Sequence, residues 1–565
     1  MNKSPVSLLA ATLAAALLAG CAAPVNTPPS APSKVINLVA LNDFHGHLEA
    51  SKFVYTSAQA AGEKTMTAGG IDNLAAALKV YRSEDKDLLF VGAGDLVGAS
   101  PAMSSMWADE PSLAALSMLG MNLSSVGNHE FDQGRIELLR KQKGGCASPL
   151  PAKACKFAPD FKGAAFTYLA ANVTDSATGQ PFMPAYAIRE VKGVKIAFIG
   201  AVLKDTASVV TASGIAGLSF GDEAEAINRA AGAARGEGAT VFVVLIHEGG
   251  STVEAYDQPQ CSQLKGPIVG IAKKLDPAIR LIISGHTHKG FQCEVDGRTI
   301  TQAQMGGHVL SRIKLDIDGA GKVSHIDVHN VPVVPGQYPA DANVAAYLAE
   351  VRARSSAALA RPVAKVDSRS VGRRANAAGE TPLGSMIADA AVEATRSEGV
   401  QIGFMNVGGM RADFDVGPDL VATFGQAQVV LPFSNTLVVM DMTGAQVRGL
   451  LEQQFQRPDG SDHAAMLQVS NGLRYRWDNA RPSGAKVVPG SIRINGAPLE
   501  DAKTYRVVAN NFLAEGADGF PMFASARNKR DTSIVDLDAF IGLLVKRAQA
   551  APAPALTAPR IERLN

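Results

Sequence analysis

The chain has 565 residues, of which 47% are hydrophobic and 19% are charged, a composition typical of folded globular proteins rather than disordered or collagen-like ones. This length predicts two substantial domains. The formal net charge is only +1, from 54 Lys and Arg against 53 Asp and Glu, so no global basic field exists to hold a nucleic-acid polymer. An anionic substrate would have to be recognised by local residues.

The first 34 residues have the features of an export and anchoring signal. Lys3 supplies a positive start, and the apolar run after it is too short to span a bilayer comfortably. Residues 17–21, Leu-Leu-Ala-Gly-Cys, resemble a bacterial lipobox, in which Cys21 is lipidated and becomes the first mature residue. An ordinary signal peptide followed by an incidental cysteine is the alternative. We expect a lipoprotein signal peptide over residues 1–20, a Pro- and Ala-rich tether over residues 21–34, and a lipid anchor in the cell envelope, on either face of the outer membrane.

Four further cysteines form an even-numbered set, which favours disulfides in an exported protein. They are Cys146, Cys155, Cys261 and Cys293. Three pairings are possible, and the pairs Cys146–Cys155 and Cys261–Cys293 close the most local loops. A zinc site built from the four is a weaker alternative, because none shows a tight Cys-x-x-Cys spacing.

Five short apolar segments end abruptly in polar residues that can bind a metal. The transitions are residues 35–41 into Asn42-Asp43-Phe44-His45, 88–91 into Gly92-Ala93-Gly94-Asp95, 124–126 into Gly127-Asn128-His129-Glu130, 241–246 into His247-Glu248-Gly249-Gly250, and 279–283 into Ser284-Gly285-His286-Thr287-His288. Such runs predict strands buried on both faces, covered by helices such as residues 71–83 and 112–119. Ligands of open α/β sheets bind beyond the carboxyl ends of the strands, so the five polar ends are expected to converge.

Aspartate, asparagine and histidine spread over separate loops are typical of a catalytic metal site. The ordered motifs DFHGH, GAGDLVG, GNHEFD, a lone His after an apolar strand, and GHTH resemble those of calcineurin-like metallophosphoesterases. In particular they resemble the bacterial 5'-nucleotidase and UDP-sugar hydrolase family. The resemblance implies a layered α/β catalytic domain, a β-sandwich flanked by helices, with two divalent ions such as Zn²⁺ or Mn²⁺ as cofactors.

The resemblance also assigns a role to each motif residue. Asp43, His45 and His288 would hold one ion, Asn128, His247 and His286 the other, and Asp95 would bridge both. His129 matches the family's non-ligand histidine, which stabilises the transition state or protonates the leaving oxygen, and Asp132 matches the carboxylate that orients it. His47 is expected to support the metal ligands without binding a metal ion itself. Four histidines outside any motif are interpreted as surface or packing residues: His308, His325, His329 and His463.

The second half of the chain carries loops that resemble the 5'-nucleotidase C-terminal domain. They are Asn406-Val407-Gly408-Gly409-Met410-Arg411, LPFSN at residues 431–435, and NFLAEGADG at residues 511–519. Val407 and Met410 depart from the family's loop. The planar fork of Arg411 suits a phosphate or carboxylate, and Arg373 matches a phosphate-binding arginine. A second family arginine is missing near Ala377, which puts diphosphate-containing substrates in doubt.

In this family two phenylalanines sandwich the base of the nucleotide. The resemblance therefore implies that Phe433 and Phe512 stack on a purine or pyrimidine, at about 1 to 3 kcal/mol per base and without selecting among bases. Phenylalanines in loops are more often core residues, but the Gly-rich context and Asp518 favour stacking. Asp518 is expected to accept hydrogen bonds from ribose hydroxyls and Asn406 to contact the base, and Asn435 is a further substrate-binding residue.

These observations predict two domains joined by a helix. The expected boundaries are 35–338 for the metallophosphoesterase domain, 339–362 for the linker helix, 363–548 for a mixed α/β nucleotide-binding domain, and 549–565 for an Ala- and Pro-rich tail. Because the metal ligands and the base clamp lie in different domains, the substrate must bridge an interdomain cleft. We expect the domains to rotate about the linker to bring the phosphate onto the metals.

The expected function is an exported two-metal hydrolase that releases phosphate from nucleoside 5'-monophosphates, with UDP-sugars as a further substrate class. One alternative within the same superfamily is a 2',3'-cyclic nucleotide phosphodiesterase with 3'-nucleotidase activity, and another is a sulfur-oxidation thiohydrolase. The paired phenylalanines favour a nucleotide over a sulfur carrier. An alternative of another class is a non-enzymatic periplasmic metal- or nucleoside-binding lipoprotein, for which His129 and Asp132 would be unnecessary. The sequence predicts neither base preference nor oligomeric state.

Overall fold

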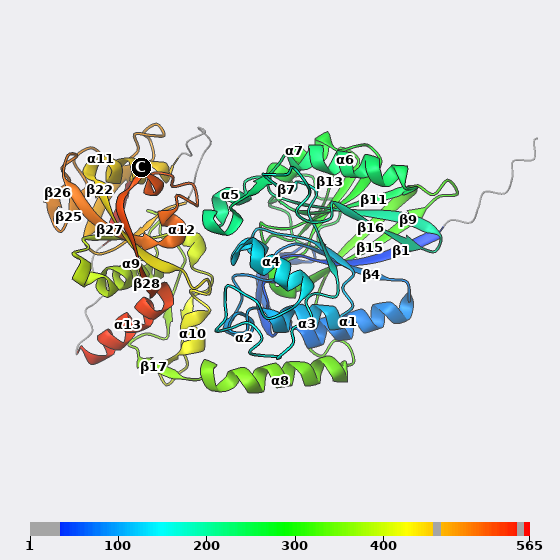
Figure 1. Ribbon diagram of the computed structural model, residues 1–565, viewed down its shortest axis with the longest axis horizontal. Helices are drawn as coiled ribbons and strands as arrows, with labels where there is room; N and C mark the ends of the chain where they lie inside the picture. The colour runs from blue at the N-terminus through cyan, green and yellow to red at the C-terminus, as the bar shows by residue number, and fades with distance from the viewer. Residues whose placement is uncertain (1–33, 456–464, 551–558) are drawn as a thin grey trace, which may run out of the picture.

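The computed structural model describes residues 34–455, 465–550 and 559–565, and these residues form two lobes (Figure 1). The predicted signal peptide, Cys21 and His463 lie outside the described residues. Within the described ranges, no helix combines the length and the apolar character that a membrane span requires.

The catalytic lobe contains two mixed six-stranded sheets. The first runs β16 (Val323–Pro332), β15 (Val309–Ile317), β1 (Lys34–Leu41), β4 (Leu89–Ala93), β5 (Leu123–Ser125) and β6 (Thr167–Leu169). The second runs β13 (Phe291–Val295), β14 (Arg298–Gln302), β12 (Ile279–Ser284), β11 (Val241–His247), β9 (Val194–Val202) and β8 (Tyr186–Val191). Buried side chains from both sheets, such as Val91 and Val243, form one core cluster. The sheets therefore pack face to face as a sandwich.

Helices cover the outer faces of this sandwich. The first sheet is covered by α1 (Ile71–Glu84), α3 (Glu110–Met118) and α4 (Gly134–Lys143), and the second by α6 (Glu223–Gly236) and α7 (Pro267–Lys274). In α1, Ile71, Leu74 and Leu78 are buried at helical spacing, which places one apolar face against the sheet. The α/β sandwich flanked by helices that the sequence predicts is confirmed.

The long helix α8 (Ala342–Leu359) connects the two lobes along one edge (Figure 1). The Asp341 carboxylate caps its first turn by accepting from the backbone N–H of Asn343 and Val344. Its apolar face contributes to the catalytic core, and the Trp107 indole donates to Ser355 Oγ at 3.0 Å. The helix is thus packed onto the catalytic lobe, and the chain crosses to the other lobe after it ends.

The C-terminal lobe is built on a five-stranded sheet. Its order is β23 (Gln468–Val469), β19 (Ile402–Met405), β27 (Thr504–Asn510), β22 (Thr436–Thr443) and β28 (Arg527–Val535). Helices α9 (Pro382–Ala394), α11 (Gly444–Gln453) and α13 (Asp536–Gln549) pack on it. Smaller elements used below are α2 (Ala102–Ser105), α5 (Thr206–Val209), α10 (Phe424–Gln428), α12 (Asn511–Ala514), β24 (Leu473–Asp478) and β29 (Ile561–Leu564).

The end of the chain is more ordered than its Ala- and Pro-rich composition suggests. Strand β29 pairs in parallel with β24, and Ile561 is buried in the core of the C-terminal lobe. Beside it, the buried Arg560 guanidinium forms an ion pair with Asp389 at 2.7 Å and donates to the carbonyl of Val469. Residues 559–565 therefore belong to the C-terminal lobe rather than to a tail.

Candidate active site

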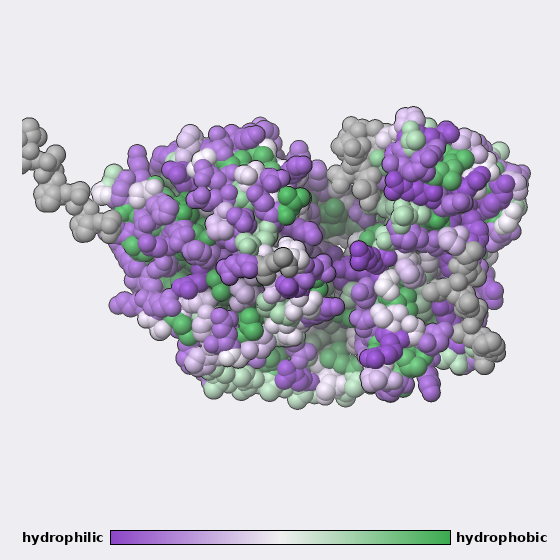
Figure 2. Space-filling model, turned by 180° about the vertical axis from the view of Figure 1, so that it is seen from behind, coloured by the Kyte–Doolittle hydropathy of each residue, from purple (hydrophilic) through white to green (hydrophobic). Residues whose placement is uncertain are grey.

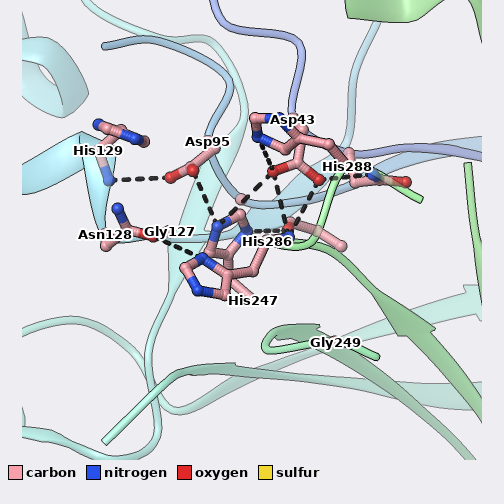
Figure 3. A network of polar contacts seen from close by, with 12 residues as sticks. Asp43, Asp95, Gly127, Asn128, His129, His247, Gly249, His286 and His288 are labelled. Carbon is pink, nitrogen blue, oxygen red and sulfur yellow. Dashed lines mark hydrogen bonds and ion pairs between the residues drawn. The ribbon is translucent and has the colours of Figure 1, made fainter. Parts of the chain in front are cut away.

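The polar ends of the five predicted strands meet in one place (Figure 3). Asp43 and His45 follow β1, Asp95 follows β4, Asn128 follows β5, His247 ends β11, and His286 and His288 follow β12. The strands belong to both sheets, so the site lies where the carboxyl ends of the two parallel sets come together. The convergence that the sequence predicts is thereby observed.

The ligand atoms of Asp43, His45 and His288 form one compact group. These atoms lie within 4.8 Å of one another, which is close enough for one ion to bind all three. His45 Nε2 is 3.0 Å from His288 Nε2, and His288 Nε2 is 3.3 Å from Asp43 Oδ1. The ring nitrogens thus face each other across a carboxylate, as the predicted first metal site requires.

Asp95, His247 and His286 form a second group with the same spacing. His247 Nε2 lies 2.9 Å from Asp95 Oδ2, and His286 Nδ1 lies 3.0 Å from Asn128 Oδ1. Asp95 Oδ2 is also 3.8 Å from His45 Nε2 of the first group. Asp95 therefore stands between the two groups, in the position expected of a bridging carboxylate.

Five of these residues have a left-handed backbone that non-glycine residues rarely adopt. They are Asp43 (φ 50°), His45 (φ 47°), Asp95 (φ 50°), His286 (φ 76°) and His288 (φ 57°). Backbone hydrogen bonds hold the strained turns, because the N–H groups of Asp43 and His45 donate to the carbonyls of Gly94 and Asp95. Strain of this kind concentrates at functional sites, where the surrounding structure compensates for it.

The electrostatics of the site favour a bound cation. Burial alone would raise the pKa of Asp43, but the His288 and His247 rings hold it well below its usual value. Burial would likewise lower the pKa of His247, but the Asp95 and Asp43 carboxylates raise it to about 10. The fully buried carboxylates therefore attract positive charge, which is the charge that a divalent ion supplies.

Glu130 organises the backbone around Asp95, a role that the sequence did not reveal although Glu130 lies in the GNHEFD motif. Its buried carboxylate accepts hydrogen bonds from the N–H groups of Asp95 (2.9 Å), Leu96 (2.9 Å), Val97 (3.3 Å) and Gly127 (2.5 Å). The hydroxyl of Tyr168 donates to it at 3.3 Å. Burial and the neighbouring Asp95 carboxylate raise the pKa of Glu130 to about 7.

His129 and Asp132 form the pair that the sequence predicts. His129 Nδ1 lies 2.8 and 3.0 Å from the two Asp132 oxygens, which leaves Nε2 on the side of the ring away from Asp132. Burial opposes charge on His129, but Asp132 and Asp95 raise its pKa above the usual value. The His129 N–H also donates to Asp95 Oδ1 at 2.8 Å, so the pair is held beside Asp95.

A cavity of about 170 Å³ lies beside this centre, between the two lobes. From the catalytic lobe it is lined by Asn128, His129, Asp132, Gln133, Val209, Val210, Thr211 and His286, and from the C-terminal lobe by Asn406, Gly408, Gly409, Arg411, Phe433, Asn435, Phe512 and Asp518. Figure 2 shows the surface hollowed between the lobes. A molecule in this cavity would contact the metal-ligand loops and the C-terminal loops together.

Most of the predicted substrate residues line the cavity. Asn406 donates through its amide to Asp518 Oδ2 at 3.1 Å, so the two are held together. The Arg411 guanidinium lies 5.8 Å from the centre of the Phe433 ring. Arg373 is exposed and does not line the cavity; its guanidinium donates to the Met410 carbonyl, next to Arg411, and its role in phosphate binding stays a prediction.

His308, His325 and His329 are packing or surface residues, as the sequence predicts, whereas the expected support of the metal ligands by His47 stays a prediction. His308 is buried, accepts or donates at 2.7 Å with Ser51 Oγ and stacks on Phe53. His47 is half-buried beside it, and burial lowers the pKa of His47 to about 3. His325 and His329 are exposed on β16.

Both predicted disulfides, Cys146–Cys155 and Cys261–Cys293, are formed. The first closes a loop that reaches the other lobe, where Lys153 Nζ lies 3.4 Å from Ser434 Oγ.

Two known families match parts of the chain: the calcineurin-like phosphoesterases over residues 36–290 and the 5'-nucleotidase C-terminal domain over residues 358–525. The cell wall protein Lmo0130 of Listeria monocytogenes is 30% identical over 552 residues, which cover 91% of this chain and 68% of that protein. The endonuclease YhcR of Bacillus subtilis is also 30% identical, over 85% of this chain. This chain spans only 37% of the length of YhcR.

The fold is similar to that of a solved structure, a 5'-nucleotidase precursor from Thermus thermophilus. The two share 27% sequence identity with a TM-score of 0.73, over 94% of this chain and 100% of the other. The similarity therefore extends across both lobes and the linker.

Proposed function

The chain belongs to the family that joins a calcineurin-like phosphoesterase domain to a 5'-nucleotidase C-terminal domain, and on this premise we propose that it releases phosphate from nucleoside 5'-monophosphates. The observation that carries the proposal is the interdomain cavity. It joins His129 and the metal-binding loops on one side to Phe433 and Phe512 on the other. A nucleotide is a phosphate ester that fits this arrangement, because its phosphate can contact the metal-binding loops while its aromatic base contacts the two phenylalanines.

The residues of the site fit a pair of divalent metal ions. The two groups of ligand atoms share Asp95 as a neighbour, and their carboxylate, imidazole and amide donors suit Zn²⁺, Mn²⁺ or Fe. We propose that Asp43, His45 and His288 hold one ion, and that Asn128, His247 and His286 hold the other with Asp95. When bound, such ions activate water and stabilise charge on the phosphoryl group.

The side chains around the cavity would bind the substrate and assist the departure of the leaving group. Arg411 would bind the phosphate, because its guanidinium lies beside Phe433 and near the site's carboxylates. His129 would stabilise the developing charge or donate a proton from Nε2 to the leaving oxygen, while Asp132 holds its Nδ1. Phe433 and Phe512 would stack on the base, and Asp518 would accept from the ribose hydroxyls.

The other readings of the sequence are less favoured. A passive binding protein would not need the His129–Asp132 pair, whose geometry suits proton transfer. The matched C-terminal domain is that of 5'-nucleotidases, which favours 5'-monophosphates over cyclic nucleotides or sulfur carriers. We include UDP-sugars as a second substrate class, although only Arg411 of the two arginines lines the cavity.

We further propose a location in the cell envelope, with Cys21 as the lipid anchor. The lipobox-like residues 17–21 support it, and so does the similarity to a protein named as a cell wall protein.

We also propose that the lobes rotate about residues 360–363, because α8 packs on the catalytic lobe up to its end. An interdomain disulfide that locks the lobes should abolish turnover, and an unchanged kcat in the locked form would reject the rotation.

The direct test is phosphate release by the protein lacking residues 1–21 from AMP, UDP-glucose and 2',3'-cyclic AMP, with Mn²⁺ or with a chelator. We expect metal-dependent hydrolysis of AMP, reduced by orders of magnitude in Asp95→Ala. Glu562→Ala, at an exposed position in β29, is the matched surface control. Hydrolysis that persists in the chelator, or no release from any of the three substrates, would overturn the proposal.

A further inference from the structure

Residues 208–212 of the catalytic lobe, here named the 208–212 segment, are hydrogen-bonded to the C-terminal lobe. The segment comprises the last two residues of α5 and the three residues after it, and α5 lies beside that lobe in Figure 1. The carbonyl of Ser208 accepts from the N–H of Asp518 at 2.8 Å. The N–H of Ala212 donates to Glu515 Oε2 at 2.6 Å. Two hydrogen bonds thus join this segment to the loop that carries the proposed ribose-binding residue.

The same segment forms part of the cavity wall. Val209, Val210 and Thr211 line the cavity that also contains Phe433 and Phe512. Val210 is only 2% exposed and belongs to the core cluster of the catalytic lobe, which anchors the segment. The cavity proposed for the nucleoside is therefore lined by both lobes, and the 208–212 segment contributes Val209, Val210 and Thr211 to the lining from the catalytic lobe.

Asp518 connects this wall to the residues proposed to read the base. Its backbone is in the left-handed region, with φ 58°, so its N–H reaches Ser208 while its side chain stays with Asn406. Asn406 in turn accepts from the amide of Asn510 at 3.1 Å. A chain of hydrogen bonds therefore runs from the 208–212 segment through Asp518 to the base-facing side of the cavity.

We propose that the 208–212 segment is a nucleoside-recognition element: it covers the sugar and base with Val209, Val210 and Thr211, and it holds the Asp518 loop in place. This inference rests on the proposed nucleotide substrate and adds a specificity determinant on the catalytic lobe. An ester without a nucleoside gains nothing from the segment, because its phosphate contacts only the metal-ligand loops and Arg411. The segment should therefore discriminate nucleotides from simple phosphate esters.

Ala212→Pro tests the hydrogen bond with little disturbance of the backbone. Ala212 begins a short 3₁₀ turn, Ala212–Ile215, where the proline ring is tolerated, and Thr211 before it has φ −65° and ψ 129°, which proline favours in its predecessor. The substitution removes only the N–H that donates to Glu515. Ala212→Ser retains that N–H and so separates the loss of the hydrogen bond from a change of side chain.

The readout is the ratio of kcat/KM for AMP to kcat/KM for p-nitrophenyl phosphate, which lacks a nucleoside. Losing one exposed hydrogen bond to a carboxylate should lower this ratio about fivefold in Ala212→Pro. Glu515→Ala should lower it equally, and the double variant should lower it no further, because both changes remove one interaction. Glu515 is exposed, so its variant keeps the test valid if Ala212→Pro fails to fold.

A second measurement probes the wall itself. Adenosine should inhibit p-nitrophenyl phosphate hydrolysis competitively, and Val209→Asp should weaken this inhibition about tenfold by placing a charge in the apolar wall. If the wild-type protein hydrolyses p-nitrophenyl phosphate but no nucleotide, the proposed function fails. If it hydrolyses AMP while the ratio and the adenosine inhibition are the same in every variant, the inference about the 208–212 segment is wrong.

Discussion

The ring of Phe433 lies over the imidazole ring of His129, with centroids 5.6 Å apart and planes inclined by 22°, although the two residues belong to different lobes. The proposed base-stacking residue and the proposed proton donor are thus in direct contact. The Arg411 guanidinium also lies over the Phe433 ring, 5.8 Å from its centre, so a base that stacks on Phe433 would lie close to both His129 and Arg411. The contact couples the position of the C-terminal lobe to the catalytic pair.

Phe433→Leu should raise KM for AMP about tenfold, because leucine retains apolar contact but cannot stack on a base. KM for p-nitrophenyl phosphate should change much less, since that substrate brings no nucleobase. Steady-state kinetics with both esters provides the comparison, and Phe182→Leu, at a half-buried aromatic away from the cavity, is the matched control. Equal effects on both esters would mean that Phe433 serves only to support His129.

Asp132→Asn should lower kcat for AMP about 100-fold, because the amide does not stabilise a protonated His129 as the carboxylate does. The effect should be smaller with p-nitrophenyl phosphate, whose leaving group departs readily without a proton. The ratio of the two kcat losses therefore measures proton donation. Identical losses with both substrates would indicate that His129 only stabilises the charge on the phosphoryl group.

The convergence of the seven candidate metal ligands could be predicted because they lie at the ends of five short strands. Asp43, Asp95 and His247 are identified by residues within a few positions along the chain, and parallel strands place their carboxyl ends together. The linker helix could also be predicted from local signals, because the helix-favouring residues and the Asp341 cap lie within one segment. Such patterns can be identified from the sequence alone, because they depend only on residues that are close together along the chain.

Other features depend on residues far apart in the chain and could not be predicted. Ser208 meets Asp518 across the lobes, yet neither position carries a local signal for the other. The exposed placement of Arg373 depends on the Met410 carbonyl that its guanidinium contacts. Strand β29 follows an Ala- and Pro-rich stretch and forms because β24 offers a free edge and Asp389 pairs with Arg560.

Glu130→Gln should reduce both stability and metal binding. An amide in place of the carboxylate turns an N–H₂ group toward backbone donors such as Asp95 N and Gly127 N, which loses hydrogen bonds worth roughly 2 to 3 kcal/mol of unfolding free energy. Because Asp95 is then less well held, the affinity for Mn²⁺ should fall about tenfold or more. Urea unfolding and calorimetric titration of the metal-free protein with Mn²⁺ measure the two effects.

Tyr168→Phe is the control for this prediction, because it removes only the 3.3 Å contact with Glu130 and keeps the aromatic packing. Its unfolding free energy should fall by about 1 kcal/mol or less. Unchanged Mn²⁺ affinity in Glu130→Gln would show that Asp95 is held in place by other contacts, such as its hydrogen bond from His129 N.

Asp536 should make the stability of the C-terminal lobe depend on pH. It is the first residue of α13, is 4% exposed, and accepts from Leu537 N, while its own N–H donates to the carbonyl of Asn435. Burial raises the pKa of Asp536 from 3.8 to about 7. A raised pKa means that the folded state holds the proton more tightly than the unfolded state.

The sign follows from this difference. Below pH 3.8 the carboxyl is protonated in both states, so its full contribution to stability is present. As the pH rises toward 7, the unfolded state ionises first, and stability is lost by up to about 1.4 kcal/mol per pH unit, with an upper bound of roughly 4 kcal/mol. Above pH 7 both states are ionised and the loss is complete.

Asp536→Asn should therefore flatten the decline in unfolding free energy between pH 4.5 and 7.5 and leave the variant more stable than the wild type at the upper end. The asparagine retains the size of the side chain and an oxygen to accept from Leu537 N. Urea unfolding of both proteins at several pH values gives the slopes, with Asp87→Asn at an exposed site as control. Parallel pH profiles for wild type and Asp536→Asn would show that the buried carboxyl titrates at its ordinary pKa.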